Sequence, residues 1–248
     1  MFNFFKKTPQ VEAKMPFKTD IHCHIVPGVD DGSPDVDTSV ELVERLMSMG
    51  IERIFASPHV TEDTFENTPE KLDAALMSLN DALHERNIDI RVSRSAEYRI
   101  DDFFKSQLEG GIATPLPNNF ILIENSFIQE PWGLEQFIFD LKVKGYKPIL
   151  AHPERYTYYA EKPRRSRYDK LFSLGVLFQV NMLSLAGRYG KTERDAALYL
   201  LEKGYISFLG TDMHNHSHAD CIEAYLSSRQ YAKVADALRR TAKNDIWI

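Results

Sequence analysis

The chain has 248 residues, of which 43% are hydrophobic and 27% charged, with a formal net charge of -6. This length suits one large α/β domain or two small ones with a sizeable core. The negative charge and the scattered lysines and arginines exclude the basic groove that nucleic-acid binding needs. No apolar run approaches the roughly 18 residues that span a bilayer, so we expect no membrane insertion.

Cysteine usage and the N-terminal segment indicate a reducing compartment. Cys23 and Cys221 lie far apart and form no CxxC pair, so we expect no disulfide framework and a cytoplasmic location. A basic pair, Lys6 and Lys7, is not followed by the apolar core of a secretory signal. We expect residues 1–17 to be an N-terminal tail and residues 18–248 to form the folded domain.

From residue 18 onward, short β-type runs alternate with longer helical segments. The strand candidates are residues 18–24, 53–59, 90–97, 120–124, 147–152, 176–181 and 205–212. Helical segments at 33–50, 68–87, 133–145 and 192–204 lie between them. In the first helix, Val36, Val40 and Val43 recur at helical spacing. Ser33 before Pro34 is typical of a helix start.

Repeated strand–helix units predict a parallel α/β fold. No Pro/Gly-rich linker or low-complexity stretch divides the seven units, so we expect a single domain. The pattern alone does not separate a closed seven-stranded barrel from an open doubly wound sheet. No GxGxxG or GxxxxGK(S/T) motif follows a strand, which disfavours nucleotide binding.

Each predicted strand ends in a polar residue. In parallel α/β folds, functional residues gather at the carboxyl ends of the strands. In chain order these ends carry His22 and His24, His59, Glu97, Glu124, His152, Asn181, and Asp212 followed by His214. Because nearly all of them are good metal ligands, their common position predicts one shared site.

Two of the strand ends carry ligand pairs with the same spacing. His22 and His24 are two residues apart, so both face the same side of an extended strand. Asp212 and His214 repeat this spacing at the last strand. A single strand histidine is more often a hydrogen-bonded structural residue, but the two pairs together favour a metal site.

Two carboxylates, Glu97 and Glu124, each follow an apolar strand. A buried carboxylate carries a large desolvation cost unless a cation or a metal ion pairs with it. The alternative partner is an arginine, for which Arg94, Arg99 and Arg155 are the candidates. The accompanying histidines favour a metal ion.

The predicted donor set mixes imidazole and carboxylate without thiolate. This composition argues against a structural zinc site and suits Mn²⁺, Fe²⁺ or catalytic Zn²⁺. About eight ligands are too many for one ion, so we expect a cluster of two or three ions with a shared carboxylate. Metal clusters of this kind usually hydrolyse phosphoesters, because they lower the pKa of bound water and clamp the phosphoryl oxygens. Neither cysteine lies in a CX5R phosphate loop, which disfavours a thiol-phosphate intermediate.

A set of ordered motifs resembles a known family. They are D-I-H-C-H-x-x-P-G-x-D-D-G, S-P-H, A-E-Y, L-I-E, A-H-P-E-R-Y and G-T-D-M-H-N, running from Asp20 to Asn215. The chain resembles the PHP-domain protein-tyrosine phosphatases of the CpsB/YwqE/CapC type. This resemblance implies a distorted (β/α)7 barrel with a three-metal, typically manganese-dependent centre. It also implies dephosphorylation of tyrosine on bacterial kinases that control capsule or exopolysaccharide assembly, with the kinase C-terminal tail as the partner.

The resemblance also implies which residues bind each ion. The first ion would be held by His22, His24, Glu97 and Asp212, the second by Glu97, Glu124 and His152, and the third by Asp31, His59 and His214. Asp31 enters through the resemblance alone. By itself the residue is typical of a turn or a helix cap near "DDGSP", and Asp30 competes with it.

Substrate binding is expected to centre on Arg155, which matches a phosphate-binding arginine of the family. A guanidinium fork suits phosphate oxygens, although a surface ion pair with Glu154 or Glu161 is the alternative. We expect catalysis to depend on His152 and Arg155.

The chain departs from the family pattern after G-T-D-M-H-N, where a second substrate arginine is often found. Here the segment carries His216 and His218, and no arginine follows until Arg229. The two histidines would contact phosphate, transfer a proton or remain solvated, and we favour the solvated interpretation.

Two other functions remain open on the sequence. One is a PHP-type small-molecule phosphatase, such as a histidinol-phosphate phosphatase. The other is a non-catalytic metal-binding scaffold that docks a kinase tail or an assembly protein. Assembly into a homo-oligomer is compatible with each of them.

Overall fold

The computed structural model describes residues 14–247, so residues 1–13 of the expected tail lie outside the described part. The strands are β1 (Thr19–Asp20), β2 (Arg53–Ala56), β3 (His59–Val60), β4 (Arg91–Arg94), β5 (Glu97–Arg99), β6 (Phe120–Glu124), β7 (Lys147–Ala151), β8 (Leu177–Asn181) and β9 (Ile206–Gly210). The α-helices are α1 (Val36–Ser48), α2 (Pro69–Glu85), α3 (Asp102–Glu109), α4 (Leu134–Val143), α5 (Thr157–Ala160), α6 (Ser166–Ser173), α7 (Met182–Ala186), α8 (Lys191–Glu202), α9 (His216–Leu226) and α10 (Arg229–Thr241). Short 3-10 helices are η1 (Pro117–Asn119), η2 (Pro153–Arg155), η3 (Lys162–Arg164) and η4 (Asn244–Trp247).

All paired strands run parallel, in two sheets ordered β1-β2-β4 and β3-β5-β6-β7-β8-β9. The predicted strands at 53–59 and 90–97 are each divided between the two sheets. One interruption falls at Pro58, which has no N–H to donate to a ladder. The amide of Glu97 still donates to the Pro58 carbonyl at 3.0 Å, so the chain stays paired across the break.

The beginning and the end of the sheet order lie side by side. Cys23 and Met213 form an isolated parallel bridge, and the Asp212 amide donates to the His22 carbonyl at 2.7 Å. Asn244 also donates to the carbonyls of Thr19 and Leu209. The first and last strand segments are therefore linked at a second place.

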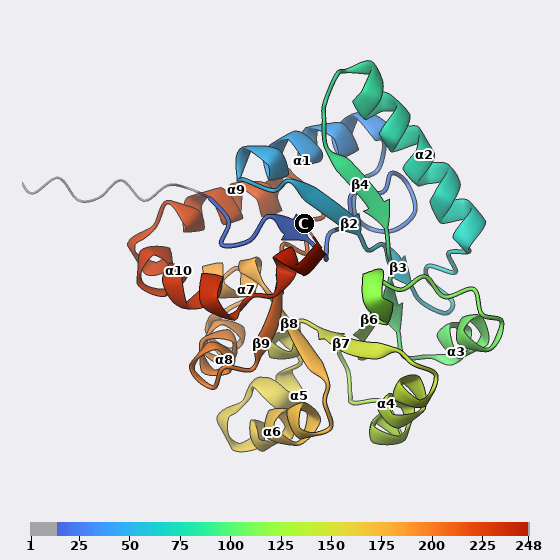
Figure 1. The fold of residues 1–248 in the computed structure, drawn as a ribbon. Helices are drawn as coiled ribbons and strands as arrows, with labels where there is room; N and C mark the ends of the chain where they lie inside the picture. Colours follow the sequence, from blue (N-terminus) through green and yellow to red (C-terminus); the bar gives the residue numbers. More distant parts are fainter. Residues whose placement is uncertain (1–13, 248) are drawn as a thin grey trace, which may run out of the picture.

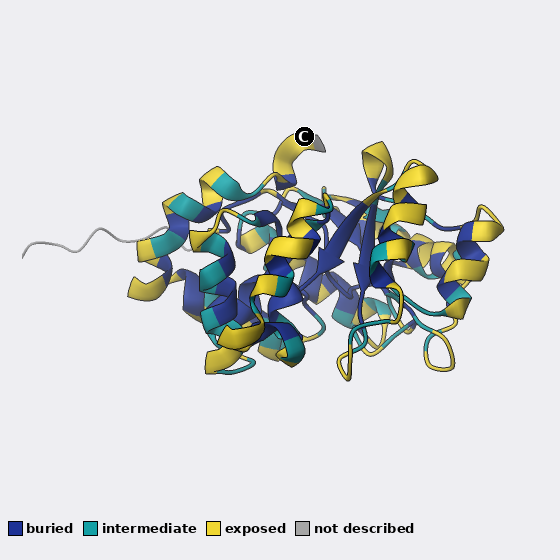
Figure 2. Ribbon diagram, turned by 90° about the horizontal axis from the view of Figure 1, so that it is seen from below, coloured by how far each residue is buried: buried dark blue, intermediate teal, exposed yellow. Residues whose placement is uncertain are grey.

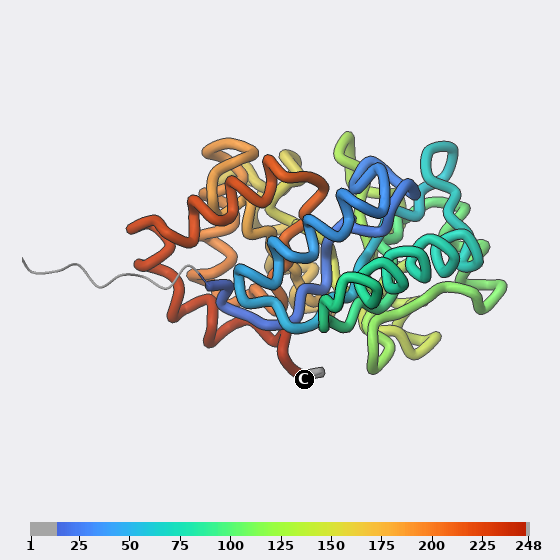
Figure 3. The backbone as a smooth tube through the Cα atoms, turned by 90° about the horizontal axis from the view of Figure 1, so that it is seen from above, coloured from blue at the N-terminus to red at the C-terminus, as the bar shows by residue number. Residues whose placement is uncertain are grey.

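Helices surround the strands (Figure 1), and the exposed residues lie on the outward faces of the helices and on the loops (Figure 2). The helices α1 and α2 lie next to each other, and α9 lies beside α1 (Figure 3). Both faces of the strands are buried. Ile149 and Ala151 of β7 pack in a small inner cluster with Phe208, whereas Leu150 packs in the larger core against the helices. The result is a single mixed α/β domain built on parallel sheets.

Two local details differ from the sequence expectation or extend it. Helix α1 begins at Val36 rather than near Ser33, because Asp35 is the cap and accepts from the Thr38 amide at 2.8 Å. Met15 and Phe17, within the expected tail, are buried in the core. Among residues 14–247, no helix is long and apolar enough to cross a membrane.

Candidate metal centre

The structure brings together all nine residues that were predicted to bind metal. Their ligand atoms form four groups within 4.8 Å, namely His24/Asp31/His59/His214, His22/Glu97/His152, His22/His24/Asp212 and His59/Glu97/Glu124. Glu124 ends β6, His152 follows β7, and Asp212 and His214 follow β9. His59 and Glu97 begin β3 and β5, and His22, His24 and Asp31 lie in the segment after β1. As in the sets that the resemblance implies, Asp31, His59 and His214 share one group, and His22, His24 and Asp212 share another. The groups overlap, however, since His24 also lies with Asp31 and His22 also lies with His152.

Glu97 occupies the middle of the cluster and is fully buried. One carboxylate oxygen, Oε2, lies 3.2 Å from Nε2 of His22 and 3.0 Å from Nδ1 of His59. The other oxygen, Oε1, lies 2.9 Å from Nε2 of His152. A carboxylate with histidines on both oxygens is well placed to be shared between two cations.

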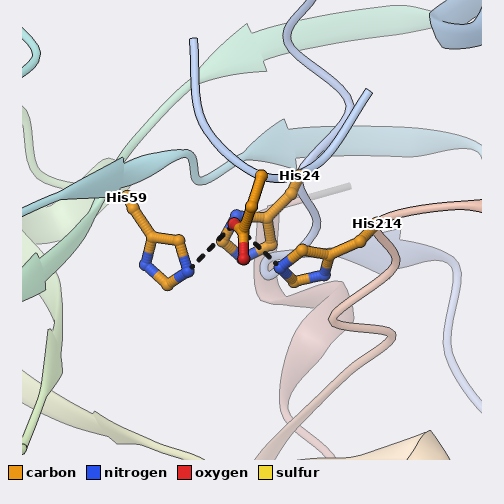
Figure 4. Close-up of side chains that lie close together, drawn as sticks. His24, His59 and His214 are labelled. Carbon is orange, nitrogen blue, oxygen red and sulfur yellow. Dashed lines mark ion pairs between the residues drawn. The ribbon is translucent and has the colours of Figure 1, made fainter. Parts of the chain in front are cut away.

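The outer end of the cluster is formed by Asp31 and three histidines. The histidines, His24, His59 and His214, point toward one another in Figure 4. Oδ1 of Asp31 lies 3.6 Å from Nε2 of His59 and 3.6 Å from Nε2 of His214. The Asp31 side chain is 61% exposed, so this end of the cluster is open to solvent.

Its neighbour Asp30 has a different position. The Asp30 side chain is buried, with Oδ2 at 2.8 Å from Nδ1 of His24, and the carboxylate also accepts from the His59 amide at 3.0 Å. A Cβ on Gly32 would lie 2.2 Å from the His24 carbonyl oxygen, so this turn requires glycine. Asp30 therefore orients His24, while Asp31 faces the other histidines.

Three further residues support the ligands. Asn181 was a strand-end candidate and Arg99 a candidate partner of the buried glutamates, whereas Gln179 was not predicted from the sequence. Oε1 of Gln179 lies 2.7 Å from Nδ1 of His22. The side-chain amide of Asn181 donates to Oδ2 of Asp212 at 2.6 Å, and Arg99 donates to Glu124 at 2.9 Å. Histidines that bind metal usually place their second ring nitrogen against such a partner, which fixes the ring orientation. Gln179 and Asn181 are two apart on β8, and this alternation is the signal that could have indicated a shared face.

Two cluster residues have left-handed backbone conformations, His152 with φ 32° and Asp212 with φ 51°. This region is costly for residues other than glycine and is concentrated at functional sites. The His152 amide donates to Gln179, and the Asp212 amide donates to His22, so the surrounding contacts hold both residues in place.

The electrostatics of the cluster fit bound cations. Burial opposes the charge of Glu97, but His22 and His59 nevertheless hold its pKa well below the usual range. Burial lowers the pKa of His22, yet Glu97 and Asp212 raise it overall to about 9. Oε2 of Glu97 and Nδ1 of His59 lie 3.0 Å apart, but among the described residues neither buried atom has a partner with hydrogen-bond geometry. Acidic groups and unpartnered lone pairs around one point are the environment that a divalent cation stabilises.

A cavity of about 340 Å³ opens onto the cluster. It is lined by Asp31, His59, Glu124, Phe127, His152, Arg155, Tyr189, Asp212, His214, Asn215 and His218. Arg155 donates to Asp212 at 2.9 Å instead of pairing with Glu154 or Glu161. Its guanidinium carbon lies 4.1 Å from the ring centroid of Tyr189 and 4.8 Å from that of Phe127. The arginine is therefore held between two aromatic rings at the edge of the cluster.

Comparison with known proteins identifies the family. A family model described as "Capsular polysaccharide synthesis, CpsB/CapC" matches residues 18–236. The chain belongs to the CpsB/CapC family.

Named relatives of this CpsB/CapC chain include the tyrosine-protein phosphatase YwqE of Bacillus subtilis, which is 37% identical over 79% of this chain and 77% of its own. The tyrosine-protein phosphatase CpsB of Streptococcus agalactiae is 30% identical over 79% of this chain and 82% of its own. A solved structure matches with a TM-score of 0.74 and 32% identity, covering 91% of this chain and 95% of that one. It is described as YwqE from Bacillus subtilis and CpsB from Streptococcus pneumoniae, "unique metal-dependent tyrosine phosphatases".

His216 and His218 stand in the segment where the family resemblance implies a second substrate arginine. The surroundings of these two histidines differ. His216 is half-exposed and its Nε2 lies 3.0 Å from Glu41, away from the cavity, which agrees with the solvated interpretation. His218 lies in the first turn of α9 and lines the cavity, with Nδ1 at 3.2 Å from the Asp212 carbonyl oxygen. His218 is therefore not simply a solvated loop residue.

Proposed function

We propose that this chain is a metal-dependent protein-tyrosine phosphatase that acts in capsule or exopolysaccharide synthesis. The observation that carries the proposal is the convergence of nine side chains that suit a metal ion, six of which line one cavity together with Arg155. The relatives named as tyrosine-protein phosphatases, together with a family description of capsular polysaccharide synthesis, support the substrate and the process.

The residues fit a cluster of two or three metal ions, and Mn²⁺ is the ion we expect, with Fe²⁺ or Zn²⁺ as alternatives. Imidazole and carboxylate donors without thiolate support this choice. Glu97 would be shared between ions, because histidines face both of its oxygens. We retain His22, His24, Asp31, His59, Glu97, Glu124, His152, Asp212 and His214 as the ligand set. When bound, such ions activate water and neutralise phosphoryl oxygens.

Arg155 would bind the phosphate of the substrate. Its guanidinium lines the cavity next to the cluster, and stacking on Tyr189 fixes the plane of its donors. His152, buried against Glu97, would keep its place through the contacts that hold its left-handed backbone. A tyrosine leaving group has a pKa of about 10, so a strong general acid is not needed to expel it.

We further infer that the two sheets together form one distorted seven-stranded barrel. The Cys23–Met213 bridge between the first and last strand segments supports closure, as does the pairing across the Pro58 break. We keep the division into a tail at 1–17 and a phosphatase domain at 18–248, although Met15 and Phe17 already pack in the core.

We propose the phosphorylated tail of a bacterial tyrosine kinase as the protein substrate. We also propose a cytoplasmic location, because two cysteines far apart in the sequence and without a CxxC pair suit a reducing compartment. Assembly into a homo-oligomer also remains a proposal.

The test is a comparison of substrates after loading the purified chain with Mn²⁺. We expect phosphate release from a phosphotyrosyl peptide to exceed release from histidinol phosphate, and the His152→Ala variant to release almost none from either. Faster release from histidinol phosphate would favour a small-molecule phosphatase. Metal binding without release from either substrate would favour the non-catalytic scaffold.

A further inference from the structure

The cavity beside the metal cluster contains an unusual apolar residue. Of the lining residues within 14–247, Phe127 alone has a wholly apolar side chain. Phe127 is 40% exposed, although a large apolar ring usually stabilises a protein by being buried in the core. An exposed phenyl ring in an otherwise polar cavity is expected to contact an apolar part of the ligand.

Phe127 lies next to both the cluster and the arginine. Its ring stacks on that of His152, with centroids 5.6 Å apart and an interplanar angle of 19°. The guanidinium carbon of Arg155 lies 4.8 Å from the centroid of the Phe127 ring. If Arg155 binds the phosphate of a substrate, the group on the ester oxygen of that phosphate would lie near the exposed part of the Phe127 ring.

The loop that carries Phe127 is fixed on both sides of the residue. The Asn125 amide donates to the Tyr156 hydroxyl at 3.0 Å, and the Tyr158 hydroxyl donates to the Ser126 carbonyl at 2.6 Å. On the other side, Glu130 accepts from Arg167 at 2.7 and 2.8 Å and also from the Tyr159 hydroxyl. The ring is therefore held in position before a ligand arrives, which reduces the entropy lost on binding.

We propose that Phe127 is a specificity-determining residue that stacks on the aromatic ring of the substrate and so selects aryl phosphates over alkyl phosphates. A phosphotyrosine would bring a ring to this position. A phosphoserine would bring only a methylene group and leave the Phe127 ring uncovered. The inference deepens the proposed phosphatase function and rests on it for the natural substrate.

Phe127 also supports Arg155 through a cation–π contact. The experiment must distinguish this role from stacking on the substrate ring. Two phosphonates that resist hydrolysis distinguish the roles. Phenylphosphonate carries an aromatic ring, and methylphosphonate presents the same charged group without it. Loss of support for Arg155 would weaken the binding of both ligands equally, whereas loss of stacking would weaken only that of phenylphosphonate.

The experiment is calorimetric titration of the Mn²⁺-loaded full chain with each phosphonate. We expect the native chain to prefer phenylphosphonate, and the Phe127→Ala change to reduce this preference about threefold to tenfold, as for an aromatic pair. Ile128→Ala is the matched control, because Ile128 is adjacent, 90% exposed and not part of the cavity lining, and it should leave the preference unchanged.

Conservative variants guard against a folding defect in Phe127→Ala, which circular dichroism would detect. Phe127→Tyr should keep the ring preference, and Phe127→Leu should lower it while remaining apolar. An unchanged preference in Phe127→Leu and Phe127→Ala, or an equal weakening of both ligands, would overturn the proposal. Because binding needs no hydrolysis, a chain that binds phenylphosphonate but releases no phosphate would contradict the proposed function without affecting this result.

Discussion

The inner and outer ends of the ligand cluster are built differently. At the inner end, Glu97 and His22 are fully buried, and a glutamine on β8 fixes the second nitrogen of the histidine ring. At the outer end, the Asp31 side chain is 61% exposed, and its oxygen lies no closer than 3.6 Å to the His59 and His214 nitrogens. A buried, supported set of ligands is already arranged for a cation, whereas an exposed set must be ordered when the cation binds. We therefore expect the inner end to hold metal more tightly than the outer end.

The largest effect should come from Glu97→Gln, which removes the charge that faces histidines on both carboxylate oxygens. Metal affinity should fall by more than about 100-fold, since even supporting residues change it by roughly 10- to 100-fold. Metal content after gel filtration and kcat/KM with p-nitrophenyl phosphate measure the loss.

A second buried carboxylate provides the control for Glu97. Glu154 is equally buried, but it accepts from the backbone amide of Asn181, and within residues 14–247 no ion pair joins it to a histidine of the cluster. Glu154→Gln should therefore retain its metal. If both variants lost metal to the same extent, the effect would reflect a buried carboxylate in general rather than the central position of Glu97.

The next effect should come from Asp30→Asn, which keeps the shape of the side chain and removes its charge. Because Asp30 fixes the ring of His24, Mn²⁺ affinity should fall by roughly 10- to 100-fold. Titration of the metal-free chain with Mn²⁺ would detect the change. Unaltered affinity would show that the contact with Asp30 does not orient His24 for metal binding.

Asp31→Asn should have a smaller effect, although it changes the adjacent residue in the same way. Only the outer ion should be weakened, so the number of bound ions should fall by one, and kcat/KM by about tenfold or less. Metal stoichiometry at limiting Mn²⁺ distinguishes this result from the Asp30 variant. A loss of all ions from Asp31→Asn would contradict the division into a tight inner end and a weaker outer end.

These two aspartates also show how far the sequence could predict the site. The strand ends located eight of the nine ligands, because parallel strands bring their carboxyl ends to one edge and polar residues there stand out against apolar runs. Asp31 came only from the family resemblance, since a turn such as "DDGSP" gives no periodicity that separates it from Asp30.

The sequence also predicted the fold only in part. Alternating strands and helices predicted a parallel α/β domain, whereas the division of two strands between sheets depends on local pairing near Pro58. Contacts between distant segments were also invisible in the sequence. Examples are Gln179 with His22 and Arg155 with Asp212, which depend on how the strands are packed in space.

The smallest effect concerns the stability of the metal-free chain at different pH. Glu97 and Asp212 overcome the effect of burial and raise the pKa of His22 from 6.5 to about 9. A histidine whose pKa is higher in the folded state stabilises that state fully below pH 6.5, and the contribution is lost as the pH rises through 9. Burial and Glu97 raise the pKa of Glu124 to about 7, so its protonated form also stabilises the folded state. That contribution is lost as the pH rises from 4.5 through 7, so most of the change above pH 7 comes from His22.

The unfolding temperature of the metal-free chain should therefore fall by several degrees between pH 7 and pH 9, since about 1 kcal/mol corresponds to roughly 2–4 °C at this chain length. Scanning calorimetry after chelation measures it. With Mn²⁺ bound, the ion takes the place of the proton on the buried histidine, and the fall should disappear. A metal-free chain that is equally stable at both pH values would indicate that the carboxylates at the inner end do not hold a proton on His22 when the cation is absent.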